Sequence, residues 1–409
     1  MFKSRRKHGQ VNMKILLLSI ISLTTMRLFS DENFVSFGNL HKREVVYECE
    51  LIKKIGLEGG YKRIYFTKPT LNNSGDLSLV ESRSMRLLRC DASDNLIELD
   101  CHVDGNILLT EISPHGEYIA FQTRHEALSD SIAYSYMLYD LQGRLIWSMD
   151  NTSESRIPGI SDNGDVFFSM GMNKRNILNK DKTTYEFGDF YKEETLRRLP
   201  GGSLGSPSAM SSQGNAAVFA SESEDISPAD YSSFPLGTRM FFYSEKGELL
   251  NTYDLVKEEL LLLPFQFSDS GRFFILHYGD YMYLFKDNKL IHEENVGSFM
   301  TITFSENESI AFIITHSGCF IFHPETGEMT RTDFKGQKIA IADQGYPIVA
   351  GFSVNRIYAA NYETGELMLY EELPRYDSCQ ANLQISGDGK MISLGFNNQF
   401  RKYEIGDRK

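Results

Sequence analysis

Ser268-Asp-Ser-Gly-Arg-Phe-Phe-Ile-Leu276 joins a polar four-residue turn to a short apolar run, and this combination recurs along the chain. The other clear copies are Ser113-Pro-His-Gly-Glu-Tyr-Ile-Ala-Phe121, Ser161-Asp-Asn-Gly-Asp-Val-Phe-Phe168, Ser211-Ser-Gln-Gly-Asn-Ala-Ala-Val-Phe219 and Ser386-Gly-Asp-Gly-Lys-Met-Ile-Ser-Leu394. The polar residue that begins the turn can bond to the backbone, and the Gly supplies the positive φ of a tight turn. The apolar run that follows is typical of a strand buried on both faces.

Degenerate copies of the pattern begin at Asn72, Ser305 and Ala342, which brings the number of anchors to eight. Their average spacing is about 45 residues, the period of a four-stranded propeller blade. A second hairpin follows most copies, for example Met137-Leu-Tyr-Asp-Leu-Gln-Gly-Arg-Leu-Ile-Trp147, and supplies the two outer strands. The best helical candidate is Tyr191–Arg198, at most two turns long.

The two ends of the chain predict how the ring closes. After Ser386 there is room for two more strands but not for an outer one, whereas Glu44–Ile52 is an unpartnered strand. As the outer strand of the last blade it would remove an exposed edge. We therefore predict an all-β fold: a single β-propeller of four-stranded blades over residues 31–409, with eight blades, seven as the alternative, and strand 44–52 closing the last blade.

Ser113-Pro-His-Gly-Glu-Tyr-Ile-Ala-Phe121, followed by Leu138-Tyr-Asp-Leu-Gln-Gly143, resembles the WD40-like repeat of bacterial propellers, including those of the periplasmic TolB type. The resemblance covers most of residues 60–405. The Gly-His and Trp-Asp signatures of eukaryotic WD40 repeats are missing, since Trp147 is followed by Ser148. The resemblance implies the architecture and a role in holding partners, and it implies no catalytic residue.

Residues 1–30 resemble an export signal, in which a basic stretch precedes the apolar run Ile15–Leu23. That run is too short for a bilayer span of about 20 residues. Met13 could be the true start, and the cleavage position is open. We expect export to the periplasm, the cell surface or the medium without a membrane span after signal removal. An uncleaved anchor, or a cytoplasmic protein whose segment is not a functional signal, are the alternatives.

The net charge of −13 becomes about −19 without residues 1–30, which hold six basic residues and no acidic one. An acidic body repels phosphate backbones, so we expect no nucleic acid partner. We expect no cofactor and no metal, because the nine His are scattered singly and the five Cys lack metal-ligand spacing. Asp162-Asn-Gly-Asp165 is interpreted as turn chemistry. Cys90 and Cys101 flank a predicted hairpin and could pair, although five buried, unpaired Cys are the simpler expectation.

Gly201-Gly-Ser-Leu-Gly205 matches the nucleophile-elbow pattern Gly-x-Ser-x-Gly. That motif needs a preceding strand, a following helix and a hydrolase domain, and the repeats leave no room for them. The apolar inner strands also bring few polar residues to the channel, where His277 is the only candidate. No catalytic residue is therefore predicted, which favours a protein that is not an enzyme.

Three long insertions, 124–133, 188–205 and 221–237, fall in connections that an up-and-down blade places on one face. They belong to neighbouring blades, so we expect them to lie together. Loops on a rigid scaffold commonly bind ligands, and aromatic and Arg side chains suit interfaces. The predicted binding residues are Arg124, His125, Asp130, Tyr191, Arg197, Arg198, Asp225, Tyr231 and Phe234.

These features predict a monomeric propeller that binds an unknown protein or peptide through the face with the long loops. A hydrolase or lyase acting on glycan or peptide at the central channel is the first alternative. A structural repeat protein of a surface assembly is the second.

Overall fold

The apolar runs that follow the repeated turns form the second strand of their sheets, and these strands are buried. In β24 (Ala311–Thr315) every side chain is buried, and in β28 (Ile348–Ser353) all but the last are. Continuous burial requires cover on both faces, which sheets stacked side by side around a ring provide.

The structure is a computed structural model that describes residues between Phe34 and Arg408, with gaps. The larger gaps are 38–42, 57–77, 91–95, 100–105, 127–131, 187–195, 198–207, 223–237, 256–264 and 374–380. Over the described ranges all regular structure is β, which confirms the predicted fold class. No helix in this part of the chain is long and apolar enough to cross a membrane.

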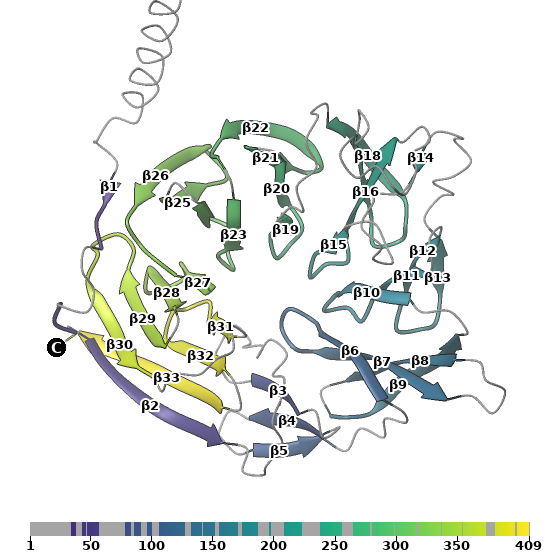
Figure 1. Cartoon of the computed structure of the whole chain (residues 1–409), viewed down its shortest axis with the longest axis horizontal. Helices are drawn as coiled ribbons and strands as arrows, with labels where there is room; N and C mark the ends of the chain where they lie inside the picture. Colours follow the sequence, from purple (N-terminus) through teal and green to yellow (C-terminus); the bar gives the residue numbers. More distant parts are fainter. Residues whose placement is uncertain are drawn as a thin grey trace, which may run out of the picture.

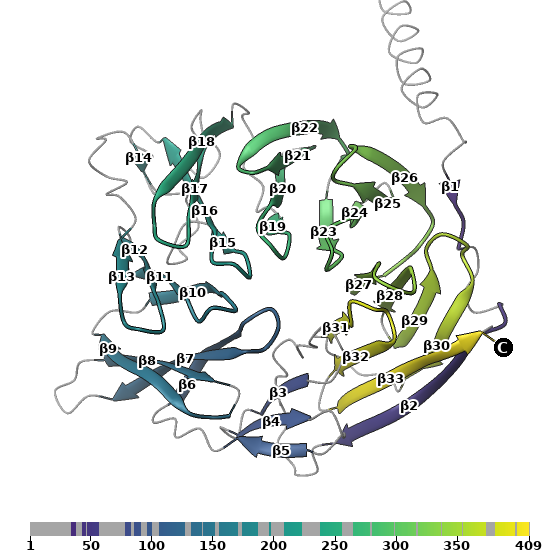
Figure 2. The same ribbon diagram turned by 180° about the vertical axis from the view of Figure 1, so that it is seen from behind.

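Eight sheets follow one another around a centre, as Figure 1 shows from one side and Figure 2 from the other. The first four contain β3–β5 (Ser78–Ser82, Arg86–Cys90, Leu96–Leu99), β6–β9 (Asn106–Ile112, Tyr118–Glu126, Ile132–Asp140, Leu145–Asn151), β10–β13 (Ser155–Ile160, Val166–Met170, Lys174–Leu178, Thr184–Glu186) and β14–β18 (Leu196–Arg197, Ser208–Met210, Ala216–Glu222, Thr238–Tyr243, Leu249–Leu255).

The other four sheets contain β19–β22 (Phe265–Phe267, Phe273–Tyr278, Tyr281–Lys286, Lys289–Asn295), β23–β26 (Phe299–Phe304, Ala311–Thr315, Gly318–His323, Glu328–Thr332), β27–β30 (Lys338–Ala342, Ile348–Ser353, Arg356–Asn361, Leu367–Glu372) and β31–β33 (Ala381–Ile385, Met391–Phe396, Gln399–Arg408) with β2 (Tyr47–Gly56). The sheet nearest the N-terminus has three described strands, so the count of eight four-stranded blades stays a prediction.

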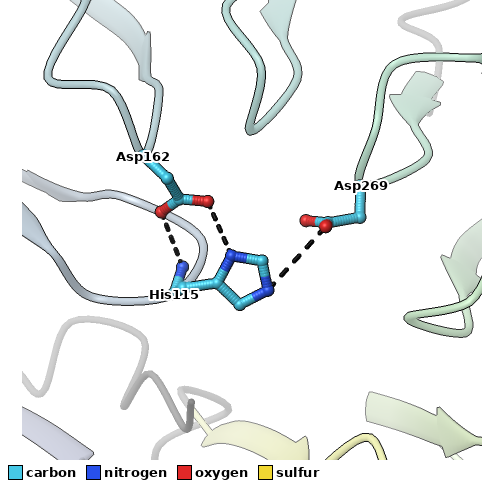
Figure 3. A group of neighbouring side chains, drawn as sticks. All are labelled: His115, Asp162 and Asp269. Carbon is cyan, nitrogen blue, oxygen red and sulfur yellow. Dashed lines mark hydrogen bonds and ion pairs between the residues drawn. The ribbon is translucent and has the colours of Figure 1, made fainter. Parts of the chain in front are cut away.

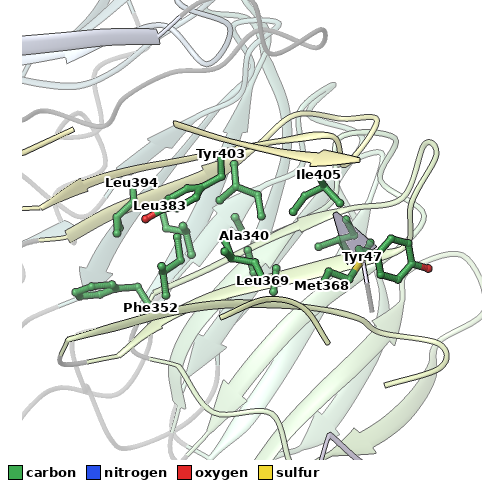
Figure 4. Close-up of a cluster of buried hydrophobic side chains, with 14 of the residues drawn as sticks. Tyr47, Ala340, Phe352, Met368, Leu369, Leu383, Leu394, Tyr403 and Ile405 are labelled. Carbon is green, nitrogen blue, oxygen red and sulfur yellow. The ribbon is translucent and has the colours of Figure 1, made fainter. Parts of the chain in front are cut away.

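The last sheet joins the two ends of the chain. β2 is its outer strand and pairs antiparallel with β33, from Tyr47 opposite Arg408 to Gly56 opposite Gln399. The strand predicted over 44–52 therefore has the expected partner, but it begins at Tyr47 and ends at Gly56. Between this sheet and β27–β30 lies a core of large apolar side chains from both (Figure 4).

A short strap outside the predicted repeat precedes β2. Its strand β1 (Phe34–Val35) pairs parallel with β26 and extends that sheet to five strands. Phe37 follows it and is fully buried, with its ring 5.0 Å from that of Phe334 in an edge-on contact. The sequence analysis assigned no strand here, because two residues carry no periodicity.

Two local predictions can be compared with the structure. The short helix predicted over 191–198 is wrong where the structure describes it, because Leu196–Arg197 forms strand β14. Cys319 is buried and free, and burial raises the pKa of its thiol to about 11. Cys101 and Cys379 lie outside the described residues, and the side chains of Cys49 and Cys90 do too, so the possible Cys90–Cys101 pair stays open.

Candidate functional site at the inner rim

Seven of the repeated turns connect the first strand of a sheet, nearest the centre, to the second (Figure 1). We call these turns the inner rim: residues 113–116, 161–164, 211–214, 268–271, 305–308, 342–345 and 386–389. In six of them the first residue is a buried Ser whose Oγ accepts a backbone N–H from the end of the turn, at 2.9 to 3.2 Å. The predicted hydrogen bonding from the first residue of the turn to the backbone is confirmed. It fixes the backbone of each turn and leaves the side chains of the second and third residues available for other roles.

Each turn of the inner rim is also bonded to the next one. Asp162 N donates to Ser212 O at 2.8 Å, and Ser212 N donates to Asp269 O at 3.2 Å. The degenerate turn at Ser305 has Glu308 where the other turns have Gly, and Glu308 adopts a φ of 63°. Its carboxylate accepts a hydrogen bond from Ser270 Oγ at 2.9 Å. The remaining links run from His115 N to Asp162 Oδ1, from Ser309 Oγ to Asp343 Oδ2 and from Gln344 N to Gly387 O. These links hold seven consecutive turns in one continuous arrangement.

Three side chains of the inner rim converge although they come from three different sheets. His115 lies between Asp162 and Asp269, as Figure 3 shows. Its Nδ1 lies 2.7 Å from Asp162 Oδ2, and its Nε2 lies 3.7 Å from Asp269 Oδ2. All three side chains are partly buried, with 16 to 28% of their surface exposed.

The electrostatics of this cluster are dominated by negative charge. The hydrogen bond to Asp162, helped by the Asp269 charge, raises the pKa of His115 to about 9 against the effect of burial. Burial raises the pKa of the Asp269 carboxyl, and His115 partly offsets that rise. The Glu306 carboxyl on the next turn also has a pKa raised by burial and interacts with His115 and Asp269. One imidazole therefore faces three carboxyl groups in a partly desolvated place, an arrangement that favours cations.

Glu306 reaches the centre because Gly387, on the last turn of the inner rim, has no side chain. A Cβ at Gly387 would lie 1.9 Å from Glu306 Oε2. Asp343, on the turn between them, adds a carboxylate whose Oδ1 is buried and has no hydrogen-bond partner among the described residues. The acidic character thus continues along the inner rim beyond the three converging side chains.

The rigidity of the inner rim can be tested at Gly271, which has a φ of +77° and would place a Cβ 2.7 Å from both Ser211 Oγ and Asn215 Nδ2. We expect Gly271→Ala to lower the free energy of unfolding by about 1–3 kcal/mol, through backbone strain and collision with a buried turn. The exposed neighbour Gln213→Ala should stay within about 0.5 kcal/mol. Chemical denaturation measures both, and equal stability of the two variants would contradict the role of Gly271.

The turns of the inner rim were predicted from the sequence, but the convergence of their side chains was not. The expectation that few polar residues converge on the channel considered the inner strands, whereas His115, Asp162 and Asp269 come from the turns before the second strands. Asp162 was interpreted as turn chemistry, a role that Asp165 fills by bonding to Ser161. Acidic side chains at the second turn position of several repeats were the available signal. His277 is buried on β20, where its Nε2 bonds Gly297 O, and burial lowers its pKa.

The predicted binding residues lie elsewhere. Arg124 and His125 belong to β7, which pairs with β8 as far as Glu126 opposite Ile132, so the 124–133 insertion is mainly an extended hairpin. Arg197 belongs to β14. The others lie outside the described residues: Asp130, Tyr191, Arg198, Asp225, Tyr231 and Phe234. Their joint role in binding stays a prediction.

Comparison with known proteins identifies no family for this chain. No family model matches the chain, and no curated protein matches it. Among solved structures, the chain is similar to the β-propeller domain of Cps50 (Swd1) from Myceliophteria thermophila, with 11% identity and a TM-score of 0.45. The similarity covers 87% of this chain and 99% of that domain. The β-propeller architecture rests on the sheets arranged around one centre, and membership of the TolB-type family stays a prediction.

Proposed function

We propose that this protein is an exported, non-enzymatic propeller that binds a protein or peptide partner through its elaborated face. We define the elaborated face as the side of the ring away from the inner rim, with insertions 124–133, 188–205 and 221–237. The supporting observation is the pairing of β14 with the end of β16, Leu196 opposite Glu222 and Arg197 opposite Ser221. This pairing joins Leu196–Arg197, within insertion 188–205, to Ser221 and Glu222, the first residues of insertion 221–237.

The direction of the strands supports the position of these insertions. β16 begins next to the inner-rim turn 211–214 and runs away from it, so Ser221 and Glu222 lie at its far end. β7 likewise begins after turn 113–116 and ends at Glu126, and both β7 and β8 are nine residues long. Arg124 is exposed on this long hairpin. A paired hairpin holds its side chains in place, which lowers the entropy lost on binding.

The test compares two triple variants of the full chain. Arg124→Ala with Tyr231→Ala and Phe234→Ala changes the elaborated face, whereas Leu145→Ala with Leu249→Ala and Ile291→Ala changes exposed apolar residues on outer strands. We expect the first variant to bind a partner identified from the producing cell's envelope at least about 10-fold more weakly, the loss of one hot-spot contact. The second should bind like the wild type, and equal binding by both would refute the proposal.

Export is a separate part of the proposal, supported by the basic and apolar pattern of residues 1–30. Fractionation of the producing cells should find the full chain outside the cytoplasm, and a chain without residues 1–30 inside it. Recovery of both chains from the cytoplasm would contradict export and leave the partner experiment valid. Size-exclusion chromatography at several concentrations distinguishes the expected monomer from a self-assembling structural protein.

A hydrolase or lyase acting on glycan or peptide is the second candidate, and one observation favours it. Two carboxylates flank the His115 imidazole, and titratable groups with shifted pKa values gather at functional sites. Turnover of a glycan or peptide substrate that Asp269→Asn abolishes, without loss of folding, would establish this function in place of the first.

A further inference from the structure

We propose that the inner rim holds a zinc ion, bound by His115 Nε2 and Asp269, with Asp162 orienting the imidazole and Glu306 supplying a further oxygen. The site lies on the face opposite the proposed partner surface and does not depend on it. Three side chains each offer a ligand atom within 4.8 Å of the others: His115, Asp162 and Asp269. They come from three different turns, and the first and the last of these residues are more than 150 positions apart in the sequence. No hairpin requires such convergence, since each turn is already stabilised by its own Ser.

The two contacts of the imidazole differ in kind. The 2.7 Å between Nδ1 and Asp162 Oδ2 is a hydrogen bond, and Asp162 Oδ1 also accepts the backbone N–H of His115 at 2.9 Å. The 3.7 Å between Nε2 and Asp269 Oδ2 is too long for a hydrogen bond. It suits two ligands of one ion, because atoms that each lie about 2.0–2.2 Å from zinc are at most ~4.4 Å apart. Nε2 and Asp269 are therefore the ligand pair, and Asp162 is the outer partner.

Asp162 has the position of the second carboxylate in a carboxylate–histidine–zinc arrangement. A ligating imidazole usually bonds a carboxylate through its other nitrogen, which fixes the orientation of the ring. Here the backbone of Asp162 is itself held by the next turn, since Asp162 N donates to Ser212 O. Figure 3 shows the resulting order, with His115 between the two carboxylates. The ring is thus oriented toward Asp269 before any ion binds.

Glu306 is the candidate for a further oxygen ligand, although it lies outside the group of three whose ligand atoms are within 4.8 Å of one another. Glu306 extends over Gly387 and interacts electrostatically with both His115 and Asp269. Water molecules can fill the remaining position, as in open zinc sites. A nitrogen ligand beside carboxylates favours zinc over calcium or magnesium, which prefer all-oxygen sets of six or more ligands. Carboxylates also outnumber the single imidazole, so a bound divalent cation lowers the electrostatic repulsion between the carboxylates of the inner rim.

The test is calorimetric titration of the chelator-treated full chain with zinc chloride, repeated with calcium and magnesium. We expect one zinc per chain, with little or no binding of the other two ions. Asp269→Asn and His115→Ala should each weaken zinc binding at least about 10-fold, and Asp162→Asn by roughly 10- to 100-fold through loss of orientation. The matched control is His323→Ala, a partly buried His at the end of β25 outside the inner rim, which should bind zinc like the wild type.

Thermal unfolding separates loss of the site from loss of the fold. Without zinc, Asp269→Asn keeps the shape of the side chain and should unfold near the wild-type temperature. Zinc should raise the unfolding temperature of the wild type and of His323→Ala but not that of Asp269→Asn. Absence of zinc binding by the folded wild type, binding that Asp269→Asn leaves unchanged, or tighter binding of calcium than of zinc would each overturn the proposal.

Discussion

A chain that lacks residues 1–56 is expected to be recovered as insoluble or unfolded protein, because it lacks strand β2. This strand is the outer strand of the sheet that joins the chain ends, and Tyr47 on it is 7% exposed within the core next to β27–β30. Without it the ten-residue strand β33 becomes an unpaired edge. A long uncovered edge strand is a template for aggregation, and ring closure is what protects a propeller from it.

The matched control is a chain that lacks residues 1–32 only, which keeps both the strap and β2. It should remain soluble and give a cooperative unfolding transition by circular dichroism. A peptide of residues 43–57 added during refolding should raise the soluble yield of the longer deletion, because it restores the missing strand. A soluble 57–409 chain with the unfolding temperature of the control would show that β2 is dispensable for closure.

The second large effect is expected at Phe37, the residue that anchors the strap. Phe37→Ala should lower the free energy of unfolding by about 3–5 kcal/mol, the usual loss for a fully buried Phe. The ring has no exposed surface and packs in a cluster with Phe334, Ile310 and Tyr362, which lie just before or after strands of two neighbouring sheets. Its removal leaves a cavity between those sheets, and the rigid strands around it close it only in part.

Leu145→Ala provides the comparison for Phe37→Ala. Leu145 is a large apolar residue that is 51% exposed on β9, so its truncation should change stability by less than about 0.5 kcal/mol. Denaturant unfolding at constant pH measures both variants. A loss below about 1 kcal/mol for Phe37→Ala would mean that the strap does not bind the ring as described, because truncation of a fully buried Phe costs about 3–5 kcal/mol.

The fold could be predicted from sequence because its determinants are local. Ser268 and Gly271 lie within one turn, and the apolar run to Leu276 follows directly. The residues of one repeat are therefore enough to predict the hairpin that it forms. The closing strand was predicted from the missing outer strand after Ser386. The strap was not predicted from the sequence. Its stability depends on the fit of Phe37 between two sheets formed nearly 300 residues later, and no local sequence pattern encodes that contact.

The convergence of side chains at the inner rim could not be predicted for a related reason. His115 is the third residue of its turn, whereas Asp162 and Asp269 are the second residues of theirs, so no single spacing aligns them. Their proximity depends on how far each turn projects toward the centre, which the packing between sheets decides. The predicted elaborated face rested on loop lengths, which indicate where the chain is longer but not which side chains meet.

The strap also determines how the ring would sit on anything attached to its N-terminus. β1 lies along the outer perimeter of the ring beside β26 (Figures 1 and 2). A tether, a fused domain or a support joined ahead of Phe34 therefore starts at the perimeter and not at either face. Attachment at the perimeter leaves both faces of the ring clear, so the inner rim and the elaborated face can be approached from opposite directions at the same time.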